Sequence, residues 1–167
     1  MAHDPNNYWE QLERLEKLIR ASELKAGVIF SFHSLILGLF IDRLDFFQEA
    51  FGGNYVLIIL ACLWIFCVLI SIYYCFKCFM PRIETKNKKN VFFFRDAAYG
   101  FGTIDEYTKK LMDVCSSKTE FFEMLSEQIY VESMIIDKKF TSVQKSLRFF
   151  AASFIIIIFI LLVWVMI

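Results

Sequence analysis

Three long runs of apolar residues constrain the fold of this chain more than any other feature. They cover residues 26–41, 55–80 and 149–167 and are separated by polar segments. An α-helix rises about 1.5 Å per residue and the bilayer core is roughly 30 Å thick, so about 20 apolar residues cross it. A helix also satisfies its backbone hydrogen bonds internally, as lipid requires. The sequence therefore predicts an all-α integral membrane protein with three transmembrane helices.

The three runs differ in how easily they reach across a bilayer. The first is short, so we expect either that Leu18 and Ile19 extend it as a continuous helix or that the bilayer thins locally. The second is long enough to cross with a tilt, and Lys77 can reach the interface. The third places Trp164 for the far interface. The chain is 57% hydrophobic, and the bunching of these residues supports membrane insertion.

Basic residues near the ends of the runs predict the orientation, because cytoplasmic flanks carry an excess of Lys and Arg. The turn after the first run offers only Arg43, whereas the other flanks are rich in basic residues. Those residues are Arg14, Lys17, Arg20, Lys25, Arg82, Lys86, Lys88, Lys89, Lys138, Lys139, Lys145 and Arg148. We therefore expect a cytoplasmic N-terminus, a cytoplasmic segment between the second and third spans, and a C-terminus outside.

These patterns divide the chain into six predicted segments. Before the first span, apolar residues fall on or near one face of a helix, as in an amphipathic helix. The predicted segments are an N-terminal amphipathic cytoplasmic helix (1–25), transmembrane helix 1 (26–41), a periplasmic turn (42–54), transmembrane helix 2 (55–80), a cytoplasmic helical module (81–148) and transmembrane helix 3 (149–167). The predicted module lies between the second and third spans.

Two capping boxes indicate helices within the cytoplasmic module. Thr103 with Glu106 and Ser117 with Glu120 match the pattern, and apolar residues at helical spacing follow each pair. Neither Gly nor Pro occurs after Ser117, so we expect one long helix from there into the third span. The stretch FFFRDAAYGFG (92–102) is predicted to be a turn before this helical hairpin. Its phenylalanines would pack against the N-terminal helix, and its arginine would pair with a carboxylate.

The sequence contains no recognisable catalytic machinery. It has no phosphate-binding glycine loop, no H-E-x-x-H and no nucleophile elbow, so we expect no enzyme and no metal or cofactor site. Cys75 and Cys78 form a C-x-x-C without a second pair or nearby His, which favours small membrane-helix residues over a redox or metal site. His33 lies within the first span, and we expect it to be neutral and hydrogen-bonded to a neighbouring helix. Balanced charges argue against nucleic-acid binding.

Three segments in order give the chain a family resemblance. IRASELKAG (19–27), FFFRDAA (92–98) and EQIYVESMIIDKKF (127–140) resemble segments of the transmembrane effectors of Pycsar, the bacterial pyrimidine-cyclase antiphage system. The similar proteins have an N-terminal helix with an A-D-x-K-A-like motif and two spans. An F-F-G-D-I-like motif, a Q-I-Y-like motif and a last span follow. The resemblance covers nearly the whole chain.

The chain departs from the family pattern at three positions. Glu23 stands where the family usually has Asp, Arg95 where Gly is expected, and Glu132 where Asn is common. The arginine affects the turn or the ligand preference.

The resemblance implies a membrane effector of antiphage defence in the bacterial inner membrane. A partner cyclase makes a cyclic pyrimidine mononucleotide, cUMP or cCMP, and the effector responds by impairing membrane integrity, which causes abortive infection. The module at 81–148 would then be the sensor. Three spans enclose no channel, so we expect a homo-oligomer that damages the lipid bilayer. The alternative is a constitutive helical membrane scaffold that docks a cytoplasmic partner through the hairpin.

A cyclic mononucleotide carries one negative charge and a flat base. Cationic side chains would bind its phosphate, and tyrosine rings would stack on the base. The ligand-binding residues that we expect are Arg95, Asp96, Tyr99, Gln128, Tyr130, Lys138 and Lys139. The alternative is that these are ordinary surface lysines and core tyrosines.

Overall fold

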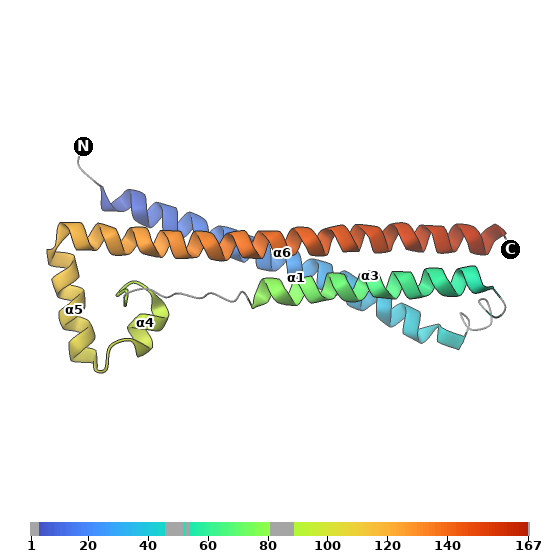
Figure 1. The fold of residues 1–167 in the computed structure, drawn as a ribbon, viewed down its shortest axis with the longest axis horizontal. Coiled ribbons are helices and arrows are strands. Elements are labelled where there is room, and N and C mark those ends of the chain that lie inside the picture. The colour runs from blue at the N-terminus through green and yellow to red at the C-terminus, as the bar shows by residue number, and fades with distance from the viewer. Residues whose placement is uncertain (1–3, 46–51, 53, 81–88, 167) are drawn as a thin grey trace. The chain divides into compact units, whose positions relative to one another are not determined.

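The described part of the chain is helical. A computed structural model describes residues 4–45, 52, 54–80 and 89–166. Its helices are α1 (Pro5–Asp42), α3 (Tyr55–Phe79), α4 (Phe94–Tyr99), α5 (Ile104–Ser116) and α6 (Lys118–Met166), as Figure 1 shows. No strand occurs among these residues, which confirms the all-α prediction. The basic residues Arg82, Lys86 and Lys88 and most of the predicted periplasmic turn (46–51 and 53) lie outside the described residues.

Three helices, α1, α3 and α6, are each long and apolar enough to cross a membrane. α1 joins the predicted N-terminal helix to the first span without a break, in agreement with the first of the two alternatives, extension through Leu18 and Ile19. α6 is likewise a single helix of 49 residues, in agreement with the absence of Gly and Pro after Ser117. The orientation of these helices stays a prediction.

The predicted capping boxes form in part. The Thr103 hydroxyl accepts a hydrogen bond from the Glu106 N–H at 3.2 Å and begins α5. Ser117 ends α5, and its hydroxyl accepts from the Glu120 N–H at 3.4 Å in the first turn of α6. The Glu120 carboxylate pairs with Lys110 of α5 at 2.6 Å. The second box therefore also ties the two helices of the hairpin together.

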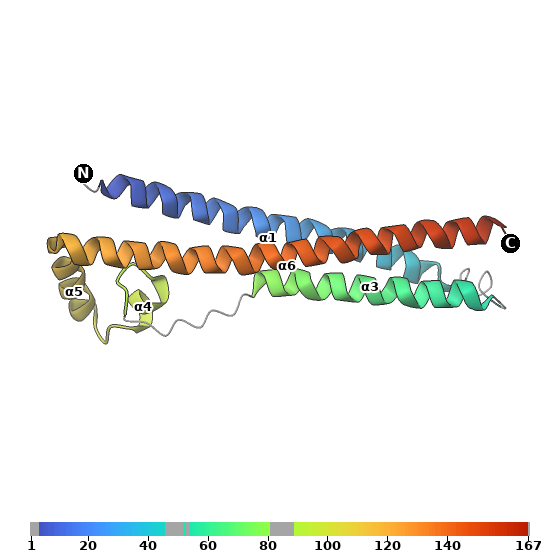
Figure 2. The ribbon, with the colours of Figure 1, turned by 45° about the horizontal axis from the view of Figure 1, so that its top comes forward.

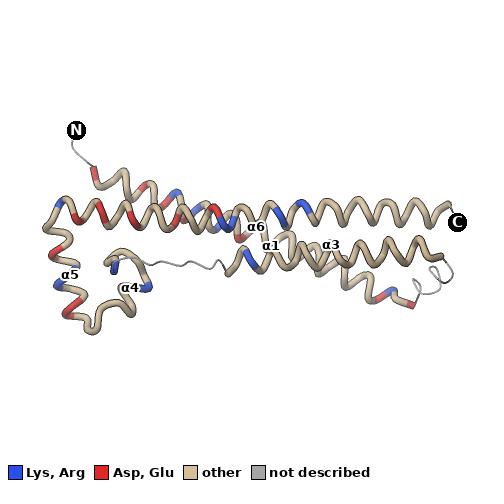
Figure 3. Tube along the Cα trace, in the orientation of Figure 1, with Lys and Arg blue, Asp and Glu red and all other residues tan. Residues whose placement is uncertain are grey.

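The chain divides into two compact units. Unit 1 contains residues 1–20 and 82–137, and unit 2 contains residues 21–81 and 138–167. The helices α1 and α6 contribute residues to both units. Acidic residues are concentrated in the unit 1 parts of α1 and α6 and in α5, and the last part of α6 carries no charge (Figure 3).

Aromatic contacts and buried aliphatic residues form the core of unit 1. Phe92 lies edge-on to Trp9 of α1, with ring centroids 5.8 Å apart, and edge-on to Phe121 of α6 at 5.6 Å. The predicted packing of the phenylalanines against the N-terminal helix is therefore confirmed for Phe92. Phe94 is an exception, because it is 77% exposed. The buried aliphatic residues of unit 1 are Leu15, Val91, Val114, Leu125, Val131 and Ile136.

Small and β-branched residues pack three helices together in unit 2. The views in Figure 1 and Figure 2 agree that α3 runs alongside the C-terminal part of α6. The core cluster consists of Ala26, Ile29, Cys75, Cys78 and Val143, with Phe150 packed against it. Small side chains allow close approach of membrane helices, where lipid supplies no hydrophobic force between them. The two thiols of the C-x-x-C thus pack as core side chains.

Residues 94–99 form the short helix α4 where the sequence analysis predicted a turn. The Phe93 carbonyl accepts a hydrogen bond from the Ala97 N–H at 2.9 Å, and the Asp96 carbonyl accepts one from the Gly100 N–H at 2.7 Å. An added Cβ at Gly100 would lie 2.6 Å from that Asp96 oxygen, so only glycine fits there. The two alanines of α4 favour a helical backbone, and Gly100 allows the backbone to end the helix with this short hydrogen bond.

The expected hydrogen bond of His33 to a neighbouring helix is not formed. The imidazole is 1% exposed, and neither ring nitrogen has a hydrogen-bond partner among the residues that the structure describes. Its ring instead lies edge-on to Phe150, with the centroids 5.1 Å apart. The prediction was wrong because the side chain that faces this ring is aromatic rather than polar.

Candidate functional site

Asn90 organises the segment that leads into α4. The residue is 4% exposed, and its amide donates hydrogen bonds to the Met124 carbonyl at 2.8 Å and the Glu127 carboxylate at 3.2 Å. Its side-chain oxygen accepts from the Phe92 N–H at 2.9 Å. The Asp96 carboxylate accepts from the Asn90 N–H, also at 2.9 Å. One buried amide thus ties the start of this segment to α6, and Asp96 ties α4 to the same residue.

Arg95 and Tyr99 give α4 an exposed face. They are four residues apart, so they are neighbours on the helix surface, and Tyr99 is 86% exposed. Arg95 is also exposed and forms no ion pair with any residue in the described part of the chain, so the expected carboxylate partner is not found. The α4 face, defined as Arg95 and Tyr99, presents a planar cation beside an aromatic ring.

Gln128 and Tyr130 have different surroundings on α6. Gln128 is buried, and its amide donates a hydrogen bond to the Glu132 carboxylate at 2.8 Å. The pKa of Glu132 lies above its ordinary value. Burial and, to a smaller extent, the nearby Glu16 carboxylate raise this pKa more than the hydrogen bond from Gln128 lowers it. Tyr130 is 62% exposed. The Gln128 amide is therefore engaged within the protein, while the Tyr130 ring is accessible.

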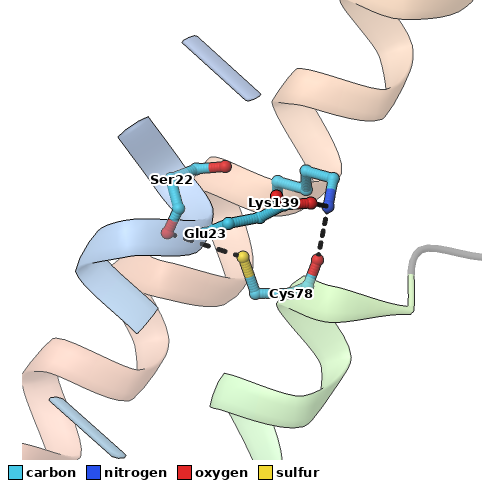
Figure 4. Close-up of polar contacts among 4 residues, drawn as sticks. All are labelled: Ser22, Glu23, Cys78 and Lys139. Atoms are coloured by element: carbon cyan, nitrogen blue, oxygen red, sulfur yellow. Dashed lines mark hydrogen bonds and ion pairs between the residues drawn. The ribbon is translucent and has the colours of Figure 1, made fainter. Parts of the chain in front are cut away.

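Lys139 links three helices of unit 2. Its ammonium group donates to the Glu23 carboxylate of α1 at 2.6 Å and to the Cys78 carbonyl of α3 at 2.9 Å (Figure 4). The Cys78 thiol donates to the Ser22 carbonyl at 3.8 Å. We call these four residues the Lys139 node. The Lys139 side chain is only 4% exposed, so its charge is already paired inside the protein, whereas Lys138 is exposed.

A second polar contact joins α3 to α6. The Ser71 hydroxyl donates to the Ser146 carbonyl at 2.9 Å, and the Ser146 hydroxyl lies 3.0 Å from the Ser71 carbonyl, to which it can donate. The Cys75 sulfur lies 3.0 Å from the Ser146 hydroxyl. All three residues are fully buried. Hydroxyl groups that reach the backbone of the partner helix require the two helices to lie very close together.

The seven residues that we expected to bind a ligand are thus distributed over both units. Arg95, Asp96 and Tyr99 lie on α4, and Gln128 and Tyr130 lie on α6, all in unit 1. Lys138 and Lys139 belong to the unit 2 part of α6. The binding role of these residues stays a prediction. The described residues contain no group of three or more His, Cys, Asp or Glu side chains that could hold a metal ion.

Comparison with known families decides which class of protein this is. The model of the family described as the Pycsar effector protein domain matches residues 7–167. The chain belongs to the Pycsar effector family. Searches among curated proteins and among solved structures found no significant match. Family membership makes the chain an effector of antiphage defence, and its three long apolar helices make it a membrane protein.

The segments that carried the resemblance provide interhelical contacts in this Pycsar effector. Segment 19–27 supplies Ser22 and Glu23 to the Lys139 node, and segment 127–140 supplies Lys139 itself. Segment 92–98 supplies Asp96, which binds the Asn90 backbone. The family pattern in this chain therefore includes residues that join helices.

Sequence reasoning missed several of the residues that organise this Pycsar effector. Asn90 was missed because it ends the polar stretch KNKKN (86–90), where an asparagine gives no signal of a buried hydrogen bond. Ser71 sits within the second apolar run, where a hydroxyl group indicates a contact with another helix. Nothing in the sequence pointed to Ser146 as its partner.

Proposed function

We propose that this Pycsar effector responds to a cyclic pyrimidine mononucleotide, cUMP or cCMP, by impairing the integrity of the inner membrane. The loss of integrity stops the infected cell from supporting phage, as in abortive infection. The observation that carries the proposal is the family match over residues 7–167, in a chain with three helices able to span a membrane. The nucleotide comes from a partner cyclase in the cytoplasm.

The continuity of α1 and α6 supports coupling between a sensor and the membrane. Both helices have their N-terminal residues in unit 1 and their C-terminal residues in unit 2. Unit 1 then acts as the cytoplasmic sensor, and unit 2 contains the membrane spans. Movement of either helix in response to a ligand has an uninterrupted helical route into the membrane. Several copies act together, because three helices are too few to line a channel.

The α4 face is the part of unit 1 best suited to a cyclic mononucleotide. The Arg95 guanidinium can donate two parallel hydrogen bonds to a phosphate, and the Tyr99 ring offers a surface for the base. Both side chains are exposed and available. Asp96 and Gln128 are bonded within the protein, so their role is to position α4 and α6. Tyr130 can add a second ring, and Lys138 is the alternative cation for the phosphate.

Dye release from liposomes tests this function. The full-length protein is reconstituted at a fixed density, and release is followed after addition of cUMP, cCMP or cAMP at equal concentrations. We expect release with at least one pyrimidine nucleotide and background release with cAMP. Properly inserted protein that stays silent with both pyrimidine nucleotides would contradict the proposal and favour the scaffold, which needs no ligand.

Changing Arg95 to Ala should weaken nucleotide binding while leaving membrane insertion intact. A charge-assisted hydrogen bond contributes about 1.5–3 kcal/mol, so we expect the Kd to rise roughly 10- to 100-fold. Arg95→Lys should give an intermediate Kd because an ammonium group lacks the planar fork. Calorimetric titration in detergent measures the Kd, with the exposed Lys109→Ala as the matched control. An unchanged Kd for Arg95→Ala would move the phosphate contact to Lys138.

A further inference from the structure

The Lys139 node concentrates the polar contacts of three helices on one ammonium group. A lysine ammonium has three donors and no acceptor. Two of its donors here are directed at different helices, to the Glu23 carboxylate of α1 and to the Cys78 carbonyl near the end of α3 (Figure 4). Removal of this single group would therefore remove links from α6 to both other helices.

The Lys139 node also lies where a shift of α1 or α6 that begins in unit 1 would first reach the residues of unit 2. On α1, Glu23 follows closely after Arg20, the last residue of unit 1 in that helix. On α6, Lys139 follows closely after Asp137, where unit 1 ends again. Both helices then continue into their apolar parts. A shift of α1 or α6 that begins in unit 1 therefore changes the distance between Glu23 and Lys139 before it reaches the membrane spans.

The two charges differ in their access to water. The Glu23 side chain is 39% exposed, whereas the Lys139 side chain is 4% exposed. A separated Glu23 carboxylate can be hydrated where it is, but a separated Lys139 ammonium would be an unpaired buried charge. Such a charge is strongly unfavourable. The bond therefore breaks only together with a rotation or displacement of α6 that takes Lys139 to water, so partly opened arrangements are disfavoured.

A buried histidine in the same helices favours the opposite change. His33 of α1 is 1% exposed, and no described protein group forms a hydrogen bond with its ring nitrogens. A buried polar group without a hydrogen bond makes the arrangement that buries it less favourable. Separation of α1 from Phe150 of α6 would let water reach the imidazole where the opened helices line a membrane defect. The packed arrangement of unit 2 is thus stabilised by the contacts of Lys139 and destabilised by the unpaired His33 ring.

We propose that the Lys139 node locks α1, α3 and α6 in a resting arrangement, and that His33 biases the same helices toward release. The trigger rests on the proposed function, since nucleotide binding in unit 1 would open the lock. The lock itself concerns only the helices of unit 2. Opening would separate the three helices and start the damage to the membrane.

Dye release without nucleotide tests the lock directly. Lys139→Met removes the ammonium group and keeps a long flexible side chain. We expect the full-length variant to release dye at least about tenfold faster than the unchanged protein when no nucleotide is present. Glu23→Gln keeps an oxygen acceptor but loses the charge, so its release rate should be intermediate. The control is Arg148→Met, which removes an exposed basic residue of the same helix and should match the unchanged protein.

Changing His33 to Leu tests the bias. Leucine is apolar and of similar size, so it removes the unpaired polar group while filling the same space. Combined with Lys139→Met, it should bring nucleotide-free release back toward the unchanged rate. Alone, it should raise the cUMP or cCMP concentration needed for half-maximal release by about tenfold. Unchanged rates in both backgrounds would refute the bias.

The outcomes separate the lock from the proposed function. One outcome is that Lys139→Met releases no dye above background without nucleotide and needs a higher cUMP or cCMP concentration than the unchanged protein for half-maximal release. In that case Lys139 is a ligand contact and the lock is refuted. If the unchanged protein ignores every nucleotide but Lys139→Met releases dye, the lock is supported and the proposed trigger is refuted. Circular dichroism and membrane flotation check folding and insertion. If Lys139→Met fails either check, Glu23→Gln is used instead. Nucleotide-free dye release from Glu23→Gln at the rate of the unchanged protein then refutes the lock.

Discussion

Replacing Ser146 with leucine should separate α3 from α6. The Ser146 hydroxyl and carbonyl both contact Ser71, and both serines are fully buried. A leucine side chain has no room where a hydroxyl group reaches the backbone of the partner helix. Overpacking of this kind costs about 3 kcal/mol when backbones must move, which corresponds to a roughly hundredfold rise in the population of the opened form.

Thiol labelling of Cys75 measures this opening. Cys75 is buried beside Ser146, so maleimide reaches it only when the helices separate. In a variant whose only cysteine is Cys75, Ser146→Leu should accelerate labelling by roughly a hundredfold. Ser34→Leu, at an exposed position of α1, is the matched control and should label at the original rate. Equal labelling rates for both variants would mean that the Ser71 and Ser146 contact does not hold the helices together.

Replacing Asn90 with alanine should release the segment that leads into α4. The change removes both amide donors and the acceptor that binds the Phe92 N–H. It also leaves the Glu127 carboxylate without this donor. Loss of a buried hydrogen-bond network of this size costs about 3 kcal/mol. We expect α4 to open far more often, since Asp96 is bonded to the backbone of the same residue.

Hydrogen exchange of the full-length protein in detergent measures the effect of Asn90→Ala. Amides of residues 90–100 should exchange roughly a hundredfold faster, while amides in the middle of α3 keep their rates. Asn90→Asp is a second variant that tests the Glu127 contact specifically. It keeps the shape of the side chain and the acceptor for the Phe92 N–H but places a second carboxylate against Glu127. It should be at least as disruptive as alanine. Protection in Asn90→Asp equal to that of the unchanged protein would show that Glu127 does not depend on the amide.

Features that depend on neighbouring residues in the sequence could be predicted. Apolar runs identified α3 within one residue and the membrane parts of α1 and α6. The absence of helix breakers after Ser117 correctly indicated one long helix. Thr103 and Ser117 were recognised as caps because a cap satisfies backbone groups only a few residues away. The short helix α4 was missed because six residues carry too little periodicity to distinguish a helix from a turn.

Contacts between helices could not be predicted in the same way. A helix presents a different side chain every 100° or so, and a small rotation about its axis changes which residue meets a neighbour. The sequence therefore did not reveal that Ser71 faces Ser146, or that His33 faces an aromatic ring. Arg95 was expected to have a carboxylate partner, but the adjacent acid in the sequence, Asp96, accepts a hydrogen bond from the Asn90 backbone instead.

The sequence by itself determined that this protein is helical, that three of its helices suit a membrane, and that it resembles the Pycsar effectors. These properties follow from local hydrogen bonding, hydropathy and motif order, which the chain carries along its length. Only the tertiary structure decided which polar groups are available to a ligand. Lys139 and Arg95 are both basic residues in the family-like segments, yet Lys139 is buried against Glu23 and the Cys78 carbonyl, while Arg95 is exposed. That difference arises because burial and pairing depend on how helices distant in sequence pack against each other.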